Sequence, residues 1–148
     1  MKSTIAMTMT LAAVLLSPLF VFGQAAGEAK IQLSEKAPYG KYLTGGEGRT
    51  LYMFTKDSKG TSNCYDACAK AWPPLATSGK PAAAPGLDNA MIGTTQRKDG
   101  TMQVTYNGMP LYYFVKDKAP GEVSGQDLKA QGGEWYLVGP DGNKNEAK

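Results

Sequence analysis

Histidine is absent from all 148 residues of the chain. Its absence excludes the Ser-His-Asp and Cys-His mechanisms of nucleophilic catalysis, histidine-ligated zinc and copper sites, and the covalent attachment of c-type haem. Most familiar hydrolase and haem-protein functions are therefore excluded. We predict a protein that is not an enzyme and that has no catalytic residue, metal site or cofactor.

The chain also lacks a cluster of charge of one sign. It contains 16 Lys and Arg residues against 13 Asp and Glu residues, with a pI near 8.8. The basic residues are scattered singly along the sequence, which is typical of a solvated surface rather than a nucleic-acid site. We expect no nucleic-acid partner.

A long hydrophobic run occurs at the N-terminus. Lys2 precedes an almost entirely apolar segment at residues 5–22, and residues 21–23 are compatible with signal cleavage. We predict a signal peptide over residues 1–23 and a periplasmic or secreted protein. The alternative is a retained transmembrane anchor, which Ser17-Pro18 and the single flanking Lys disfavour. No cysteine lies near the cleavage point, so we expect no lipid attachment there and no stable membrane anchor.

One ten-residue phrase occurs twice. The sequence GRTLYMFTKD at residues 48–57 returns sixty residues later as GMPLYYFVKD at residues 108–117, with six of ten positions identical. A repeat of this kind indicates one structural unit used twice. The repeated residues that we single out are Tyr52, Phe54 and Asp57 in the first copy and Tyr112, Phe114 and Asp117 in the second.

Both faces of the repeated phrase are largely apolar. Side chains alternate along a strand, and a strand that is apolar on both faces is typical of the covered centre of a sheet. We therefore interpret the phrase as core structure that ends in an Asp-stabilised turn. The alternative is that the two Tyr and two Asp side chains meet at a pseudo-twofold axis and bind a cation or polar ligand. Acid-base work by the two carboxylates would need them within about 5 to 10 Å of each other.

The remaining pattern predicts a mainly β protein, with antiparallel sheets from two pseudo-symmetric repeats and one short cysteine-containing helix. We expect strands at residues 42–44, 49–55, 91–97, 101–106, 109–115 and 134–138, and a helix at 63–72. We divide the chain into a flexible leader (24–38), repeat 1 (39–76), a linker (77–90), repeat 2 (91–139) and a flexible tail (140–148). The two repeats are expected to share one core, and Trp72 and Trp135 are expected to close each half with an aromatic plug.

Cys64 and Cys68 are four residues apart, which on a helix brings their Cα atoms to about 6 Å, within reach of a disulfide. In an exported protein the pair should be oxidised, and closing so short a loop contributes about 2 kcal/mol. We interpret it as a local structural link. Thiol-redox exchange is the alternative, although the spacing differs from the thioredoxin type. Metal capture by the two thiolates is less favoured because two ligands do not complete a tetrahedral site.

At these residues the chain resembles a known family. The Tyr-x-Phe-x-x-Asp phrase at 52–57 and 112–117, followed in the first copy by CYDAC at 64–68 and WPPL at 72–75, is similar to the bacterial secreted-repeat family of predicted lipoproteins. The resemblance covers residues 39–139. It implies an extracytoplasmic protein without a settled activity. The chain departs from the lipoprotein label because it lacks a lipid-acceptor cysteine.

We therefore expect an exported, non-catalytic protein that binds a small ligand or an envelope protein, or that serves the envelope structurally. Its tyrosines and tryptophans are suited to an aromatic platform or to a core. The first alternative is thiol-redox or metal handling by Cys64 and Cys68. Hydrolysis by Asp57 and Asp117 is the least supported.

Overall fold

The first sheet is formed by the N-terminal hairpin. In the computed structural model, which describes residues 27–148, β1 (Lys30–Lys36) pairs antiparallel with β2 (Gly40–Gly45) and parallel with β4 (Ala82–Ala83). Ile31 and Leu43 are fully buried in this sheet. The expectation of a flexible leader up to residue 38 is therefore wrong from Lys30 onward, because β1 gains a ladder partner on each side. The predicted signal peptide at residues 1–23 lies outside the described residues.

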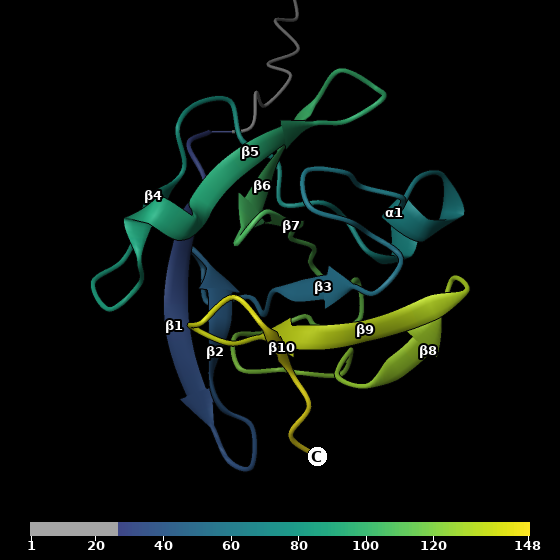
Figure 1. The fold of residues 1–148 in the computed structure, drawn as a ribbon. Coiled ribbons are helices and arrows are strands. Elements are labelled where there is room, and N and C mark those ends of the chain that lie inside the picture. The colour runs from purple at the N-terminus through teal and green to yellow at the C-terminus, as the bar shows by residue number, and fades with distance from the viewer. Residues whose placement is uncertain (1–26) are drawn as a thin grey trace, which may run out of the picture.

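The second sheet joins the two repeats. Its central strand β9 (Gly133–Val138) pairs antiparallel with β3 (Tyr52–Phe54), β8 (Leu128–Ala130) and β10 (Lys144–Asn145). Repeat 1 thus places its motif strand directly against the last long strand of repeat 2 (Figure 1).

The third sheet is the predicted meander. β5 (Ile92–Gln96), β6 (Met102–Tyr106) and β7 (Met109–Pro110) are antiparallel neighbours. The turn between β6 and β7 is Asn107-Gly108, and both residues have positive φ, as the Asn-Gly pair predicted. A short 3-10 helix, η1 (Asn89–Met91), leads into β5.

Two elements are shorter than the sequence predicted. The helix α1 covers only Ala67–Ala71 instead of 63–72, because Asp66 has positive φ and the Cys64 carbonyl accepts a hydrogen bond from the Arg97 guanidinium. The expected strand at 109–115 forms a regular β-ladder only as far as Pro110. Beyond it, Tyr112 makes single bridges to Tyr52 and Pro74 on opposite sides. The second motif copy therefore links segments rather than lying inside one sheet.

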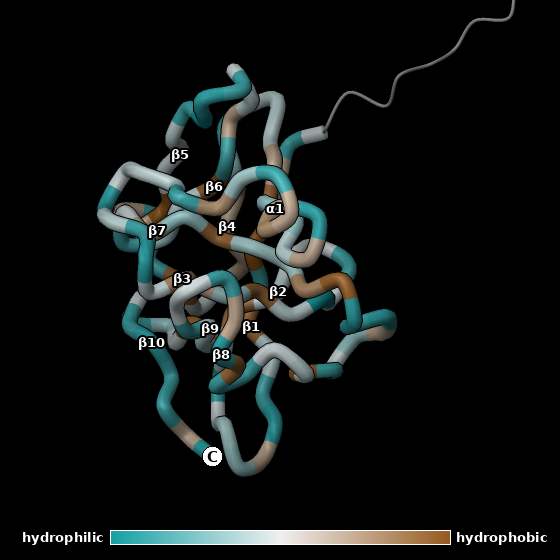
Figure 2. Tube along the Cα trace, turned by 90° about the vertical axis from the view of Figure 1, so that its right-hand side faces the viewer, coloured by the Kyte–Doolittle hydropathy of each residue, from teal (hydrophilic) through white to brown (hydrophobic). Residues whose placement is uncertain are grey.

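The buried residues form two clusters. One is aromatic and takes its rings from both repeats, and the other is mainly aliphatic and lies under the first and third sheets. Figure 2 shows the hydrophobic segments gathered where β1, β2, β3 and β9 approach one another, with hydrophilic residues at the outer turns. Mainly β architecture with antiparallel sheets and one short helix is confirmed.

Candidate functional site

The two copies of the motif meet at their tyrosines. The backbone N–H of Tyr52 donates to the carbonyl of Tyr112 at 2.8 Å, and the N–H of Tyr112 donates to the carbonyl of Tyr52 at 3.0 Å. Two residues that exchange both backbone hydrogen bonds form a hydrogen-bonded antiparallel pair. These reciprocal bonds define a local pseudo-twofold axis between Tyr52 and Tyr112.

The side chains of the motif cross over this axis. The Tyr52 hydroxyl donates to Asp117 Oδ2 at 2.5 Å, and the Tyr112 hydroxyl donates to Asp57 Oδ2 at 2.6 Å. Each tyrosine is thus bonded to the aspartate of the other repeat and not to that of its own. We call these two hydrogen bonds the crossed pairs.

The second oxygen of each aspartate is also used. Asp57 Oδ1 accepts from the backbone N–H of Asn63 at 2.7 Å, and Asp117 Oδ1 accepts from that of Ser124 at 2.9 Å. The Asp-stabilised turn that the sequence predicted is therefore present in both repeats. Charge-assisted hydrogen bonds of this kind are about twice as strong as neutral ones.

Burial sets the protonation of these groups. It raises the pKa of Tyr52 and of Tyr112 above the ordinary phenol value, and the bonded or nearby carboxylate raises each further. Burial also raises the pKa of Asp57, against the opposing effect of the Tyr112 hydroxyl and the Asn63 N–H. At neutral pH both phenols therefore remain protonated and donate.

A stack of four aromatic rings lies beside the crossed pairs. Trp72 and Trp135 are parallel with ring centroids 3.8 Å apart. Phe114 stacks on Trp72 at 4.1 Å, and Phe54 stacks on Trp135 at 4.2 Å. Each repeat thus supplies one tryptophan, and each tryptophan is covered by the motif phenylalanine of the other repeat. Both tryptophans are buried, as an aromatic plug requires, and they do not form an exposed platform.

The two cysteines form a disulfide, with Cα atoms 5.2 Å apart. Cys64 is fully buried and Cys68 is 8% exposed. The Arg97 guanidinium holds this loop from repeat 2: Nη2 donates to the Cys64 carbonyl at 2.6 Å, and Nη1 donates to Ser62 Oγ at 2.8 Å.

Arg97 is a residue that sequence reasoning missed. Its isolated position in the sequence is typical of a surface cation, but only 4% of it is exposed, and it lies over the Tyr65 ring at 4.4 Å. Nη1 also donates to Gln103 Oε1 at 2.7 Å, whereas Nε is buried without a hydrogen bond. No signal in the sequence distinguishes this arginine from the exposed ones.

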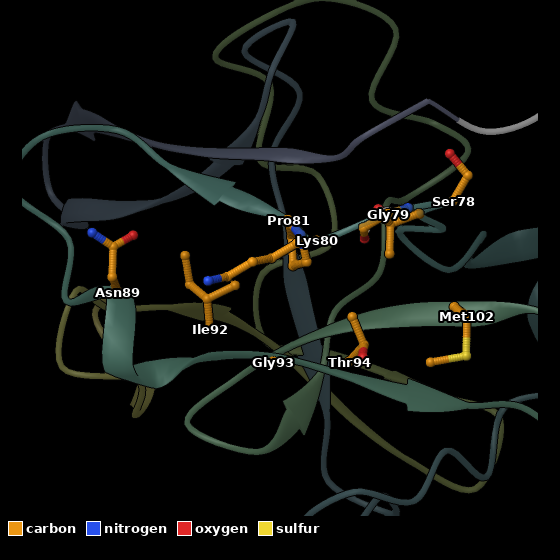
Figure 3. A pocket seen from close by; sticks show the side chains of 10 residues that line it. Ser78, Gly79, Lys80, Pro81, Asn89, Ile92, Gly93, Thr94 and Met102 are labelled. Atoms are coloured by element: carbon orange, nitrogen blue, oxygen red, sulfur yellow. Dashed lines mark hydrogen bonds between the residues drawn. The ribbon is translucent and has the colours of Figure 1, made fainter.

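A hollow lies between the linker and the β5–β6 hairpin. Its volume is about 520 Å³, which is within the range of small-molecule sites. Figure 3 shows Lys80 reaching from the linker across Ile92, with Thr94 and Met102 rising from the strands below. The sequence analysis selected none of these residues, because a linker rich in Pro, Ala and Gly carries no binding signature.

The lining residues are Thr77, Ser78, Gly79, Lys80, Pro81, Asn89, Ile92, Gly93, Thr94 and Met102. Lys80 is the only charged residue among the described residues that line the hollow. Ser78, Asn89 and Thr94 add hydroxyl and amide groups, and Ile92 and Met102 add apolar surface.

One family model matches the chain twice, and each match contains one copy of the motif. A model described as a secreted repeat of unknown function matches residues 35–76 and 93–138. The chain belongs to this family. No curated protein and no solved structure matches the chain.

Both family repeats contain a motif copy and a stacked tryptophan, and the first also contains the disulfide. The family is described as secreted, which agrees with an exported protein. Among residues 27–148 there is no helix that is long and apolar enough to cross a membrane. The described residues also contain no group of three His, Cys, Asp or Glu side chains suited to a metal ion.

Proposed function

We propose that this exported protein is a non-catalytic binding protein of the periplasm or the extracellular space, and that the hollow at Lys80 is its ligand site. The observation that carries the proposal is the difference between the motif and the hollow at Lys80. The tyrosines and aspartates of the motif are bonded to one another, and all but the half-buried Asp57 are buried, whereas the hollow is open and presents polar groups with apolar walls.

The chemistry of the hollow favours a small organic anion. Within the described residues, Lys80 makes no ion pair and is the only charged residue that lines the hollow, although the Glu28 side chain lies against the lining residue Gly79. A carboxylate or similar group of the ligand would pair with the Lys80 ammonium, and Ser78 and Thr94 supply further hydroxyl groups to the lining. Ile92 and Met102 suit a short apolar portion, and the methionine side chain adapts to several shapes. No nucleic acid is expected there, and an envelope protein is the other partner to consider.

The binding proposal is tested with a series of straight-chain carboxylates of increasing length, each paired with the alcohol of the same length. Amide chemical shifts of isotope-labelled protein report where each compound binds. We expect shifts confined to residues 77–81 and 92–94, stronger for the acids than for the alcohols.

A matched pair of variants tests the role of the cation. Lys80→Gln should weaken carboxylate binding and leave the weaker alcohol binding unchanged, because only the charge is removed. Lys41→Gln, on the exposed face of β2, should change neither. Shifts at another surface, or none across the whole series, would contradict the proposal.

A further inference from the structure

The core contains a continuous run of oxidisable side chains that ligand binding does not require. Trp72 and Trp135 are parallel at 3.8 Å. Tyr52 lies edge-on to Trp72 at 5.4 Å, and Tyr112 lies edge-on to Trp135 at 5.2 Å. The order Tyr52, Trp72, Trp135, Tyr112 therefore crosses the pseudo-twofold axis with each ring next to the following one.

Each end of this run has a proton acceptor in place. Loss of one electron from a phenol makes its proton strongly acidic, so that a hydrogen-bonded base allows the electron and proton to leave together. Asp117 Oδ2 accepts from the Tyr52 hydroxyl at 2.5 Å, and Asp57 Oδ2 accepts from the Tyr112 hydroxyl at 2.6 Å.

This arrangement is costly if cohesion is its only use. Carboxylates are destabilising when they are removed from water, and apolar side chains of similar volume often stabilise a core equally well. Asp117 is only 2% exposed and Tyr52 is fully buried. At each end of the run, a carboxylate, a phenol and an indole lie next to one another in space. This order indicates a chemical role in addition to packing.

We propose that Tyr52, Trp72, Trp135 and Tyr112 form a relay that takes up oxidising equivalents from a one-electron oxidant outside the protein, such as a high-valent metal complex. The oxidant removes one electron from the stacked tryptophans and leaves an indole radical cation. Tyr52 or Tyr112 then passes one electron to this radical cation, and its phenol proton moves to the bonded aspartate.

The step is balanced. The oxidant gains one electron, the tryptophan is restored, and the products are a neutral phenoxyl radical and a protonated carboxyl group. A one-electron reductant of the thiolate class reverses it: the electron returns to the phenoxyl oxygen and the proton returns from the aspartate.

The two ends of the relay differ in their surroundings. Asp117 is buried, whereas Asp57 is half-buried, and the Tyr112 hydroxyl also contacts Ser62 Oγ at 2.7 Å. Ser62 is in turn bonded to the Arg97 guanidinium. A proton transferred to Asp117 is better shielded from water, so the longer-lived radical is expected on Tyr52.

The experiment uses flash photolysis of the unmodified protein with tris(bipyridine)ruthenium and a sacrificial acceptor. Transient absorption should show an indole radical that decays into a phenoxyl radical. In the double variant Tyr52→Phe/Tyr112→Phe, the indole radical should persist and most of the phenoxyl signal should be lost. Asp117→Asn should shorten the phenoxyl lifetime, because it removes the proton acceptor and keeps the phenol.

Tyr136→Phe provides the matched control, because this tyrosine lies outside the relay and bonds to Glu134. It should leave the phenoxyl yield unchanged. A yield that is lost in Tyr136→Phe, or unchanged in the double variant, would overturn the proposal.

A measurement on the unmodified protein keeps the test independent of variant folding. Electron-nuclear double resonance of the trapped radical should show an exchangeable proton hydrogen-bonded to the phenoxyl oxygen, with slow exchange in deuterium oxide. A phenoxyl radical without such a proton, or one that exchanges at once, would place the oxidation on surface tyrosines and would also overturn the proposal.

Discussion

At the scale of single residues, the motif is a set of hydrogen bonds that only two repeats together can complete. Tyr52 has its carboxylate partner 65 residues away, and Tyr112 has its partner 55 residues away. A buried carboxylate that loses a bonded donor costs about 1 to 3 kcal/mol or more, because the desolvated acceptor remains. Neither member of a crossed pair can therefore be replaced alone without a loss of stability.

The pH dependence of stability should show the effect of Asp57. Its pKa is raised above the ordinary value of 3.8, chiefly by burial. Between the ordinary pKa and the raised pKa, the folded state therefore holds a proton more tightly than the unfolded state. The free energy of unfolding of the protein relative to Asp57→Asn should therefore rise as pH falls through this window. The gain is about 1.4 kcal/mol for each unit of raised pKa, and the difference should be flat at higher pH. Urea titrations from neutral pH downward measure it.

Asp141 supplies a control of opposite sign. Hydrogen bonds from Asn143 lower the pKa of its exposed carboxyl, so the relative stability against Asp141→Asn should fall as pH drops below the ordinary Asp value. If the free energy of unfolding relative to Asp57→Asn decreased on acidification, folding would favour the ionised form of Asp57. That result would contradict the raised pKa of this carboxyl.

At the scale of elements, the loop that follows each motif aspartate is the part that differs most between the repeats. In repeat 1 it is held by the disulfide and Arg97. In repeat 2 it is held by the Glu122 carboxylate, which accepts from the backbone N–H groups of Lys118 and Ala119. The two loops have the same task, which is to return a backbone N–H to the aspartate, but they are reinforced by different chemistry.

Gly125 is needed for close packing in the second loop. A Cβ atom there would lie 2.7 Å from Trp72 Cη2 and 2.9 Å from Tyr52 Cε1, both in the rigid core. We expect Gly125→Ala to lower the free energy of unfolding by about 1 to 3 kcal/mol, as overpacking does. Gly27→Ala, which meets open space, should stay within about 0.5 kcal/mol. Equal stability of both variants in urea would show that the core yields at this position.

The disulfide is expected to act structurally. Because Cys64 is fully buried, a small thiol reductant should reduce the bond slowly in the folded protein and rapidly in urea. Cys64→Ser/Cys68→Ser should lower the free energy of unfolding by about 2 kcal/mol and leave carboxylate binding at the hollow intact. Fast, reversible reduction of the folded protein would instead support the thiol-redox alternative.

At the scale of the whole molecule, the repeats share a fold that neither completes alone. β3 of repeat 1 pairs with β9 of repeat 2, and the four stacked rings alternate between the repeats. The chain is therefore a pseudo-dimer within one polypeptide. Its repeated tyrosines, phenylalanines and tryptophans lie in the aromatic cluster of the core, and its non-repeating linker forms one wall of the hollow.

The sequence predicts those features whose causes are local. The β6–β7 turn at Asn107-Gly108 and the disulfide each arise from residues close together in the chain, and the repeat is recognised from sequence identity alone. The partner of each tyrosine was not predictable, because it depends on how the repeats dock. Burial of Arg97 and the pairing of β1 with β4 also require segments distant in sequence. For the same reason the hollow had no local signature.

Double-mutant cycles in urea test the central claim, that the motif joins the repeats through crossed pairs. The cycle of Tyr52→Phe with Asp117→Asn should give a coupling energy of about 0.5 to 3 kcal/mol, as expected of residues in contact. The cycle of Tyr52→Phe with Asp57→Asn, two residues of the same motif copy, should be additive within about 0.5 kcal/mol. Coupling within a motif copy and additivity across the repeats would contradict the account.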